Sequence, residues 1–278
     1  VDAWTAGHRA RSAAGEAHPV EDFLFTYYSL RPSQLRRWHP GADVVLLGGA
    51  AAERLRWRWY QEVRTSEGDT GVAIDLDAYV EQRGAAAQRT LRLLRATAER
   101  APRLGCFGLH EWAMVYRADR RRHERWPLRL GQAGTDRVVE QGPLRCTHYD
   151  AFRFFTPDAR PRNDRVLARE DQVAREQPGC LHATMDLYKW AYKLGPVVPS
   201  ELTADCFALA REVRELDMRA SPYDLSDLGL TPVPVELPSG RAEYVALQRA
   251  FTERGQALRA RLIAVCDGVL RGVGAPLR

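Results

Sequence analysis

Hydrophobic residues recur at the spacing of an α-helix through most of this chain. The clearest example is the segment 180–194, which lies between Pro178-Gly179 and Gly195-Pro196, residue pairs that are typical of helix ends. Further long helices are predicted at residues 75–102, 200–222 and 241–270. The pattern therefore predicts a mainly α protein.

The segment 43–74 carries a different pattern. Residues 43–47, 55–64 and 71–74 are short runs in which apolar side chains cluster or alternate with polar ones, and this predicts strands. We therefore expect a small antiparallel β insertion at 43–74 within a single helical domain that spans residues 1–278.

Shorter helices are predicted at residues 18–30, 34–38 and 134–141 and around Glu111. Asp75 and Ser200 stand immediately before two of the long helical patterns. Their side chains can accept hydrogen bonds from the first free N–H groups of a helix, so both are predicted N-caps.

The composition is that of a globular protein, with 278 residues, 45% hydrophobic and 28% charged. No apolar run approaches the length that crosses a bilayer, and residues 1–17 carry too many charges for a signal peptide. We expect a cytoplasmic protein with no membrane contact. The five cysteines contain no Cys-x-x-Cys pair, which indicates reduced thiols.

The charge is basic, with a formal net charge of +5 and an isoelectric point near 9.1. Few of the 41 basic residues are lysines. Arginine suits phosphate groups better than lysine does, so the composition favours a polyanionic partner. The basic run 119–126 is either a solvated turn between helices or a loop that contacts phosphates.

The predicted helix at 180–194 carries its polar residues on one face. His182, Asp186 and Lys189 stand at positions i, i+4 and i+7, so their side chains stack along the helix. Large apolar residues such as Met185 and Tyr188 occupy the neighbouring arc. A solvated face would not need such neighbours, which indicates the wall of a pocket.

Two earlier stretches, 106–116 and 146–155, share this character. In each, a cysteine is followed by a histidine and an acid, His110 with Glu111 and His148 with Asp150, among aromatic residues. We expect the three stretches to converge, because buried ionisable groups mark functional sites more often than other positions. The alternative for each histidine is an ordinary residue of the hydrophobic core.

A third group of charges lies near the end of the helix predicted at 200–222. Glu215, Asp217 and Arg219 surround Leu216 and Met218. These charges form a buried ion-pair network or line the same pocket.

Several specific motifs are absent. The chain contains no Gly-x-Gly-x-x-Gly, no phosphate-binding loop signature, no Gly-x-Ser-x-Gly and no His-Glu-x-x-His. Their absence argues against dinucleotide binding, nucleotide hydrolysis by a phosphate-binding loop, serine hydrolase chemistry and this type of zinc protease.

Four segments, 18–28, 106–117, 176–190 and 214–225, resemble a family of actinobacterial proteins labelled 3-methyladenine DNA glycosylase. The resemblance extends over nearly the whole chain. It implies hydrolytic removal of an alkylated or otherwise modified base from DNA, with DNA as the partner and no cofactor. The helix-hairpin-helix of other alkyl-base glycosylases is absent, so the candidate residues come from the polar stretches above.

Base excision requires a flipped base that stacks on aromatic rings and a carboxylate near the sugar. The catalytic candidates are Glu111, Asp186, His110 and His182. The candidates for substrate binding are Trp112, Tyr116, His148, Tyr149, Asp150, Phe154, Tyr188, Lys189, Trp190 and Arg219. For each aromatic residue the alternative is core packing.

Two other functions fit the same residues. His110, His148 and His182, with Asp186 or Glu111, could bind zinc or non-heme iron in a helical enzyme that acts on a small molecule. In a non-enzymatic helical binding protein, the same groups would form only a buried polar network.

Overall fold

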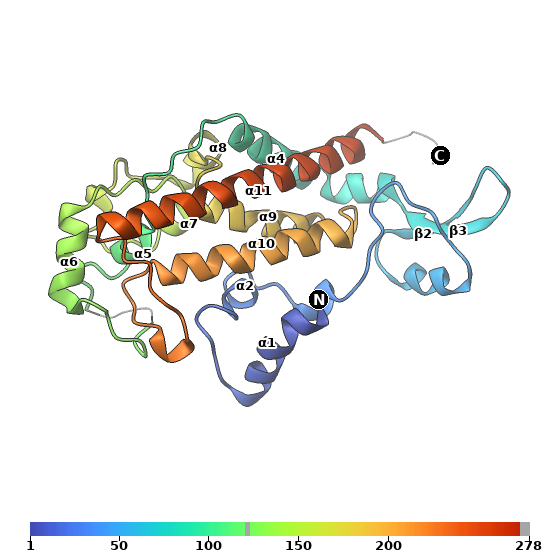
Figure 1. Ribbon diagram of the computed structural model, residues 1–278. Coiled ribbons are helices and arrows are strands. Elements are labelled where there is room, and N and C mark those ends of the chain that lie inside the picture. The colour runs from blue at the N-terminus through green and yellow to red at the C-terminus, as the bar shows by residue number, and fades with distance from the viewer. Residues whose placement is uncertain (120–122, 273–278) are drawn as a thin grey trace.

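The computed structural model describes residues 1–119 and 123–272, and it is dominated by helices (Figure 1). Arg120, Arg121 and Arg122, in the basic run 119–126, lie outside the described residues. The α-helices are α1 (Asp2–Ala14), α2 (Phe23–Thr26), α3 (Pro32–Leu35), α4 (Leu76–Ala98), α5 (Leu109–Ala113), α6 (Gly131–Gln141), α7 (Tyr149–Phe152), α8 (Gln172–Arg175), α9 (Leu181–Leu194), α10 (Ser200–Arg219) and α11 (Pro238–Arg271). The 3-10 helices are η1 (Gly49–Arg56), η2 (Arg160–Arg162), η3 (Arg169–Asp171) and η4 (Ser226–Leu228).

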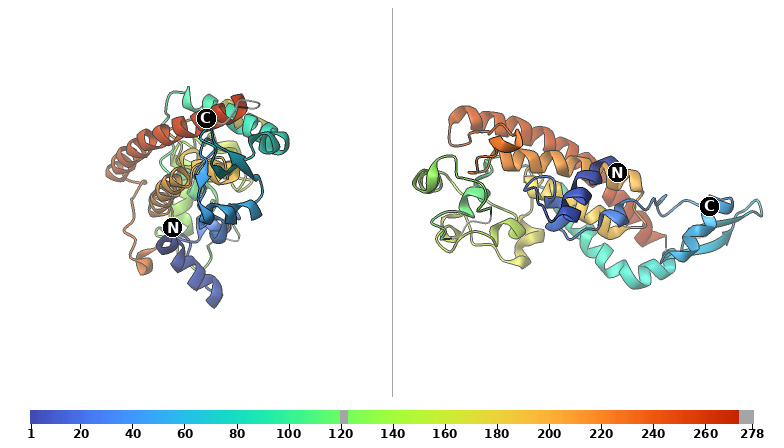
Figure 2. Two further views of the ribbon diagram at one scale, coloured as in Figure 1. Left: turned by 90° about the vertical axis from the view of Figure 1, so that its right-hand side faces the viewer. Right: turned by 90° about the horizontal axis from the view of Figure 1, so that it is seen from below.

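Helix α9 lies at the centre of the bundle. It packs against α10 and α11, and α11 in turn packs against α4 (Figures 1 and 2). Residues 181–189 of α9 are buried without interruption, so its polar side chains lie inside the protein. The predicted helix at 180–194 is confirmed, and it ends at Gly195-Pro196.

A glycine permits the close approach of α11 to α9. A Cβ atom at Gly255 would lie 2.9 Å from Cγ2 of Thr184 on α9, closer than two carbon atoms can pack. The two helices therefore meet backbone to side chain at this point, which fixes α9 within the bundle.

Three strands form an antiparallel sheet in the order β1 (Leu46–Leu47), β3 (Thr70–Ile74), β2 (Tyr60–Arg64). The sheet lies at one end of the bundle, and α5 and α6 lie at the other (Figure 1). The mainly α fold with a small antiparallel insertion is confirmed. The strand expected at 55–64 begins only at Tyr60, because Trp59 has a φ of +63°, which interrupts extended backbone.

Asp75 and Ser200, the two predicted N-caps, have different roles in the structure. Asp75 caps α4 as predicted, because its Oδ1 accepts a 2.9 Å hydrogen bond from the Ala78 N–H. Ser200 is instead the first residue of α10, and Pro199 occupies the cap position. The Ser200 hydroxyl accepts a hydrogen bond from the His39 N–H at 2.8 Å, so it serves a tertiary contact.

The helix expected at 18–30 is one turn, α2. The side chain of Asp22 accepts hydrogen bonds from Arg11 and from the His18 N–H, which replaces helical bonding there. Ser29 has a φ of +53°, which ends the turn. The hydroxyl of Tyr28 is directed to α9 instead, so tertiary contacts override the local helical pattern.

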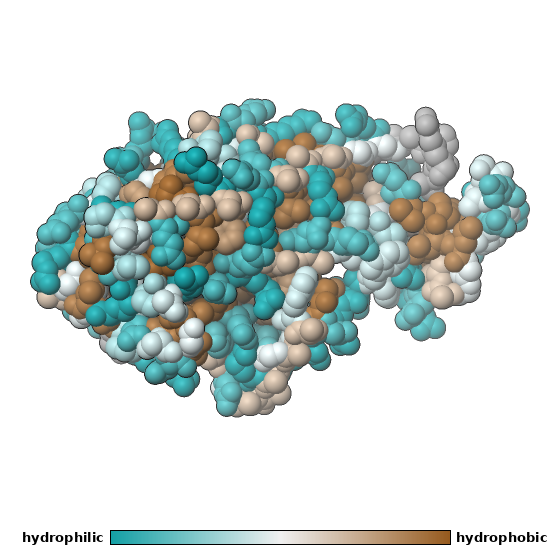
Figure 3. Space-filling view, in the orientation of Figure 1, coloured by the Kyte–Doolittle hydropathy of each residue, from teal (hydrophilic) through white to brown (hydrophobic). Residues whose placement is uncertain are grey.

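The largest hydrophobic core extends from the bundle into the sheet. Trp112, Met185, Leu209 and Phe251 belong to it, and Phe23 packs against it, as the helical pattern predicts. Figure 3 shows hydrophilic residues over much of one face, with hydrophobic surface between them and at the sheet end. Within residues 1–119 and 123–272, no helix combines the length and apolar character that membrane crossing requires.

Candidate functional site

Three histidines from distant parts of the chain meet beside α9. The ring centroids of His110 and His182 lie 4.5 Å apart at a steep angle. The rings of His148 and His182 stack at 5.2 Å. All three side chains are buried. The expected convergence of the stretches 106–116, 146–155 and 180–194 is therefore confirmed.

Local backbone geometry places each imidazole. Gly108 has a φ of +68°, and a Cβ atom there would lie 3.3 Å from the ring of Tyr244, so a glycine suits the turn that starts α5 and brings in His110. His148 is the N-cap of α7, where its Nδ1 accepts from the Ala151 N–H at 3.3 Å. This bond leaves Nε2 of His148 to face the acids.

His110, His182 and Asp217 form the first of two clusters, which we call the histidine–aspartate triad. One possible ligand atom of each residue lies within 4.8 Å of the others. Nε2 of His110 is 2.8 Å from Oδ1 of Asp217. Both atoms are shielded from solvent, yet neither makes a hydrogen bond of acceptable geometry within the described residues. The two groups form a close ion pair outside the geometry of a normal hydrogen bond. Burial acts to lower the pKa of His110, but Asp217 outweighs it and raises the pKa overall.

Arg214 balances the charge behind the triad. Its Nη1 donates to Oδ2 of Asp217 at 2.7 Å and to Oε1 of Glu111 at 3.0 Å. The guanidinium lies 3.8 Å from the ring centroid of Phe23 and is almost completely buried. Burial acts to raise the pKa of Asp217, but the charges of His110 and Arg214 outweigh it and hold the pKa well below its usual range. Asp217 is therefore a carboxylate.

His182 differs from the other two histidines in its charge state. Burial and the neighbouring charge of His110 hold the pKa of His182 well below its usual range. Among the residues that the structure describes, His182 contacts the other two imidazoles and makes no hydrogen bond through its ring. It is a neutral imidazole with free nitrogens, which is the form that binds metals.

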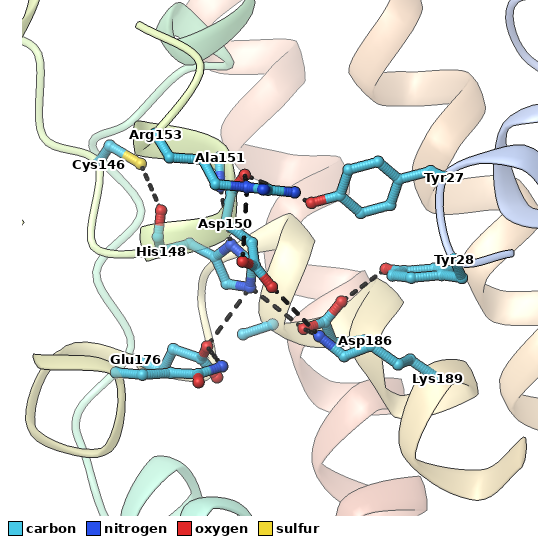
Figure 4. Close-up of polar contacts among 12 residues, drawn as sticks. Tyr27, Tyr28, Cys146, His148, Asp150, Ala151, Arg153, Glu176, Asp186 and Lys189 are labelled. Carbon is cyan, nitrogen blue, oxygen red and sulfur yellow. Dashed lines mark hydrogen bonds and ion pairs between the residues drawn. The ribbon is translucent and has the colours of Figure 1, made fainter. Parts of the chain in front are cut away.

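The second cluster, the lysine cluster, surrounds Asp186 (Figure 4). Lys189 forms an ion pair with Oδ2 of Asp186 and lies 3.5 Å from Oδ2 of Asp150. Tyr28 donates its hydroxyl to Oδ1 of Asp186 at 2.6 Å. Nε2 of His148 lies 3.3 Å from Asp186 and 3.4 Å from Glu176. His182, Asp186 and Lys189 thus share one buried face of α9, as their spacing predicts.

Charges within the lysine cluster stabilise one another. Burial acts to raise the pKa of Asp186, but Lys189 and His148 outweigh it and hold the pKa well below its usual range. Burial acts to lower the pKa of His148, but Glu176 and Asp186 raise it overall. The pKa of Glu176 is raised, chiefly by its burial. Both Asp186 oxygens therefore already have cationic or hydrogen-bonding partners.

Small cavities lie on both sides of His182. The inner cavity, about 20 Å³, is bordered by His110, His182 and the cysteines Cys106, Cys146 and Cys180. A space of about 10 Å³ on the other side is bordered by aromatic residues, Glu111 and Arg214. A water molecule needs about 10–15 Å³, so the inner cavity has room for about one water.

The remaining candidate residues lie apart from the triad. Trp112, Tyr116 and Tyr188 are buried in the hydrophobic core, and Trp112 donates its indole N–H to the Ala220 carbonyl at 2.9 Å. Arg219 pairs with Glu243 and donates to the Thr231 carbonyl. The others are placed as follows: Phe154 borders the small space beside Glu111, Tyr149 faces Arg169, and Trp190 lies under Lys189 and Lys193.

Sequence reasoning assigned no definite role to four residues of these clusters. Asp217 was one of three charges with two alternative placements, and the structure puts it in the triad while Glu215 stays exposed. Arg214 stands three residues before Asp217, a spacing that permits an ion pair on one helix face. Glu176 lies in an irregular segment, and Tyr28 lies in a segment whose periodicity predicts a helix but gives no indication of its contact with Asp186.

The triad has the donor set of a divalent metal site. Two imidazoles and one carboxylate are the ligands of many non-heme iron and catalytic zinc centres. Asp217 also receives the hydrogen bond from Arg214 that typically orients a ligating carboxylate. No family model matches the chain, and neither the curated proteins nor the solved structures contain a significant match.

Proposed function

We propose that this protein is a metal-dependent enzyme that holds zinc or ferrous iron with His110, His182 and Asp217. One observation carries the proposal: Nε2 of His110 and Oδ1 of Asp217 are buried, 2.8 Å apart and without hydrogen bonds among the described residues. The neutral ring of His182 supplies a third ligand atom within 4.8 Å.

A shared metal ion would give Nε2 of His110 and Oδ1 of Asp217, which form an ion pair here, a common partner. Buried polar atoms that lack hydrogen bonds are costly, and native proteins contain few of them. Two atoms that bind one tetrahedral zinc at about 2.0–2.2 Å lie roughly 3.3–3.6 Å apart. The 2.8 Å separation of Nε2 and Oδ1 is shorter, so the two atoms would have to move apart by about half an ångström or more to share the ion.

The lysine cluster is a weaker metal site, although His148, Glu176 and Asp186 also group closely. The ammonium of Lys189 already lies against Oδ2 of Asp186, and Tyr28 occupies Oδ1. A divalent cation there would face the repulsion of a buried ammonium. We therefore expect one metal ion for each chain, bound at the triad.

Three protein ligands leave at least one coordination position open for reaction. His110 and His182 both border the inner cavity, which has room for about one water. A zinc or iron ion in this position would activate a bound water or hold part of a substrate. Glu111 accepts a hydrogen bond from Arg214 and borders the second small space together with His182, not the inner cavity.

Metal content tests the proposal. We expect the purified full-length protein to contain about one equivalent of zinc or iron, and His182→Gln to lose it. His148→Gln is the matched control, because it changes a stacked, buried histidine outside the triad and should keep the metal. Circular dichroism verifies that both variants fold. A metal-free wild-type protein that binds neither ion on reconstitution would refute the proposal.

We propose base excision from DNA as a second candidate, on the resemblance described above and on one surface feature. A groove of about 750 Å³ along α4 and α9 contains Trp190. The basic residues that border this groove are Arg83, Arg89, Arg92, Arg169 and Lys193. An aromatic ring within a basic groove suits a stacked base and its phosphates.

The test of base excision is release of free base from alkylated duplex DNA. Glu111→Gln and Asp186→Asn keep the side-chain shape and remove the charge. If either carboxylate acts on the sugar, its variant should lose turnover and keep DNA binding, because only the transition state is affected. The absence of base release by wild-type protein at any salt concentration would exclude this function for the substrates used.

A further inference from the structure

A larger cavity adjoins the inner cavity. It has a volume of about 420 Å³ and is formed by residues 103–106 and 145–147, by Asp164, Arg165 and Leu167, and by Arg175 at the end of α8. Cys106, Arg145, Cys146 and Thr147 border both cavities. The larger cavity therefore shares a wall with the space beside His110 and His182.

Four arginines surround this larger cavity, which we call the arginine pocket: Arg103, Arg145, Arg165 and Arg175. Their guanidinium groups make no hydrogen bond or ion pair with other described residues. Asp164 is the single carboxylate that borders the pocket in the described part of the chain. Arg103, Arg145 and Arg165 are exposed and Arg175 is half-buried, so these four unpaired guanidinium groups against one carboxylate give the pocket a positive rim that faces solvent.

Two buried amide side chains hold the backbone of this pocket in place. Asn163 accepts from the Cys146 N–H at 2.8 Å and donates to the carbonyls of Cys146 and Arg165 at 3.1 and 2.7 Å. It thereby joins the segments that carry Arg145 and Arg165.

Gln177 holds the backbone of Arg103 in the same way. Its Oε1 accepts from the N–H groups of Arg103 and Gly179 at 2.8 and 2.7 Å, and its Nε2 donates to the Arg103 carbonyl at 3.3 Å. The arginine backbones are therefore fixed before any ligand arrives, which lowers the entropic cost of binding.

We propose that the arginine pocket binds the phosphate group of a small organic substrate, on the other side of the wall that it shares with the inner cavity of the metal centre. This inference rests on the proposed metal-dependent function. Guanidinium groups bind phosphate through paired N–H donors. The volume of about 420 Å³ falls in the range of small-molecule sites, roughly 300–1,000 Å³.

Binding of inorganic phosphate and phenyl phosphate to the full-length, metal-loaded protein tests this proposal by calorimetry. The double variant Arg145→Gln/Arg165→Gln should weaken the affinity for both phosphate compounds by about tenfold or more, because hydrogen bonds to charged groups are strong. Arg64→Gln/Arg249→Gln is the control, because it removes the same charge from two exposed arginines outside the cavities. It should change the affinity by less than about twofold, since these two arginines do not border the arginine pocket and salt screens their charges from it.

The outcomes separate the pocket from the metal centre. No binding of either phosphate compound, or equal weakening by both double variants, would overturn the pocket. The assignment to a small molecule would be overturned if an undamaged DNA duplex bound more tightly than phenyl phosphate and if Arg145→Gln/Arg165→Gln abolished this binding. Metal content is measured in the same samples. Phosphate binding by a protein that takes up no metal would support the anion site and refute the metal-dependent function.

Discussion

Oδ2 of Asp217 accepts a 2.7 Å hydrogen bond from Arg214, whereas its Oδ1, 2.8 Å from Nε2 of His110, accepts none within the described residues. One oxygen of this carboxylate is thus satisfied by a fixed cation, and the other is directed at an imidazole nitrogen without a hydrogen bond. That asymmetry is what a carboxylate needs to ligate a metal through one oxygen while its second oxygen is held by a neighbouring donor.

Arg214 should be essential for stability. Arg214→Met leaves the buried carboxylates of Glu111 and Asp217 without their cation, and breaking such a pair costs about 3–5 kcal/mol of unfolding free energy. Arg254→Gln is the control, because it removes an exposed pair with Glu212 and should cost about 1 kcal/mol or less. Urea unfolding of the two variants measures the difference. Equal losses would show that burial of the pair is unimportant.

The hydroxyl of Tyr28 should stabilise the lysine cluster. Tyr28→Phe removes a 2.6 Å hydrogen bond to a buried carboxylate, Asp186, and should cost about 1.5–3 kcal/mol. Tyr27→Phe removes only a 3.3 Å bond to the main-chain carbonyl of Asp150, so its cost should be about 0.5–1.5 kcal/mol. Chemical denaturation compares the two. The reverse order of costs would contradict the placement of Tyr28.

His39 should make the protein sensitive to mild acid. Burial, and then the charges of Arg37 and Arg54, lower the pKa of His39 to about 4. Its Nδ1 lies 2.8 Å from the Tyr60 hydroxyl, which can donate to the neutral ring. Below its ordinary pKa of 6.5, the unfolded chain binds a proton that the folded protein does not bind until about pH 4. The unfolding free energy should therefore fall as the pH falls from 6.5 to about 4. Above pH 6.5, the titration of His39 should have no effect on it.

The measurement is the unfolding free energy at neutral pH and near pH 5. His39→Gln keeps a hydrogen-bond acceptor for Tyr60 and cannot be protonated. The variant should lose less stability on acidification than the wild-type protein does. Identical losses would place the titration of His39 outside this pH range.

The central helix and the convergence of the three histidines could be predicted because both depend on local spacing. Helix α9 carries its polar residues at i, i+4 and i+7, and each histidine stands in an apolar stretch. The partner of His110 could not be predicted, because Asp217 reaches it only through the packing of α5 against the end of α10. Burial on every side of α9 also conceals which aromatic residues border a cavity, and Tyr188 lies in the core.

Irregular segments account for most of the other differences between the predicted and the observed structure. Residues 18–30 have the periodicity of a helix, yet Tyr27 and Tyr28 use their hydroxyls in tertiary contacts and only one turn forms. Asn163 and Gln177, which hold the arginine pocket, stand in loops where sequence patterns give no indication of partners. Long-range hydrogen bonds decide such positions, and they depend on the complete fold.

X-ray absorption spectroscopy of the metal-loaded full-length protein tests the metal centre most directly. The inner cavity brings Cys106, Cys146 and Cys180 near the triad, so a site built from sulfur is the rival arrangement. We expect a first shell of nitrogen and oxygen at about 2.0–2.2 Å, with the outer-shell scattering of two imidazoles and no sulfur near 2.3 Å. Sulfur in the first shell, or a spectrum unchanged by His182→Gln, would contradict a centre formed by His110, His182 and Asp217.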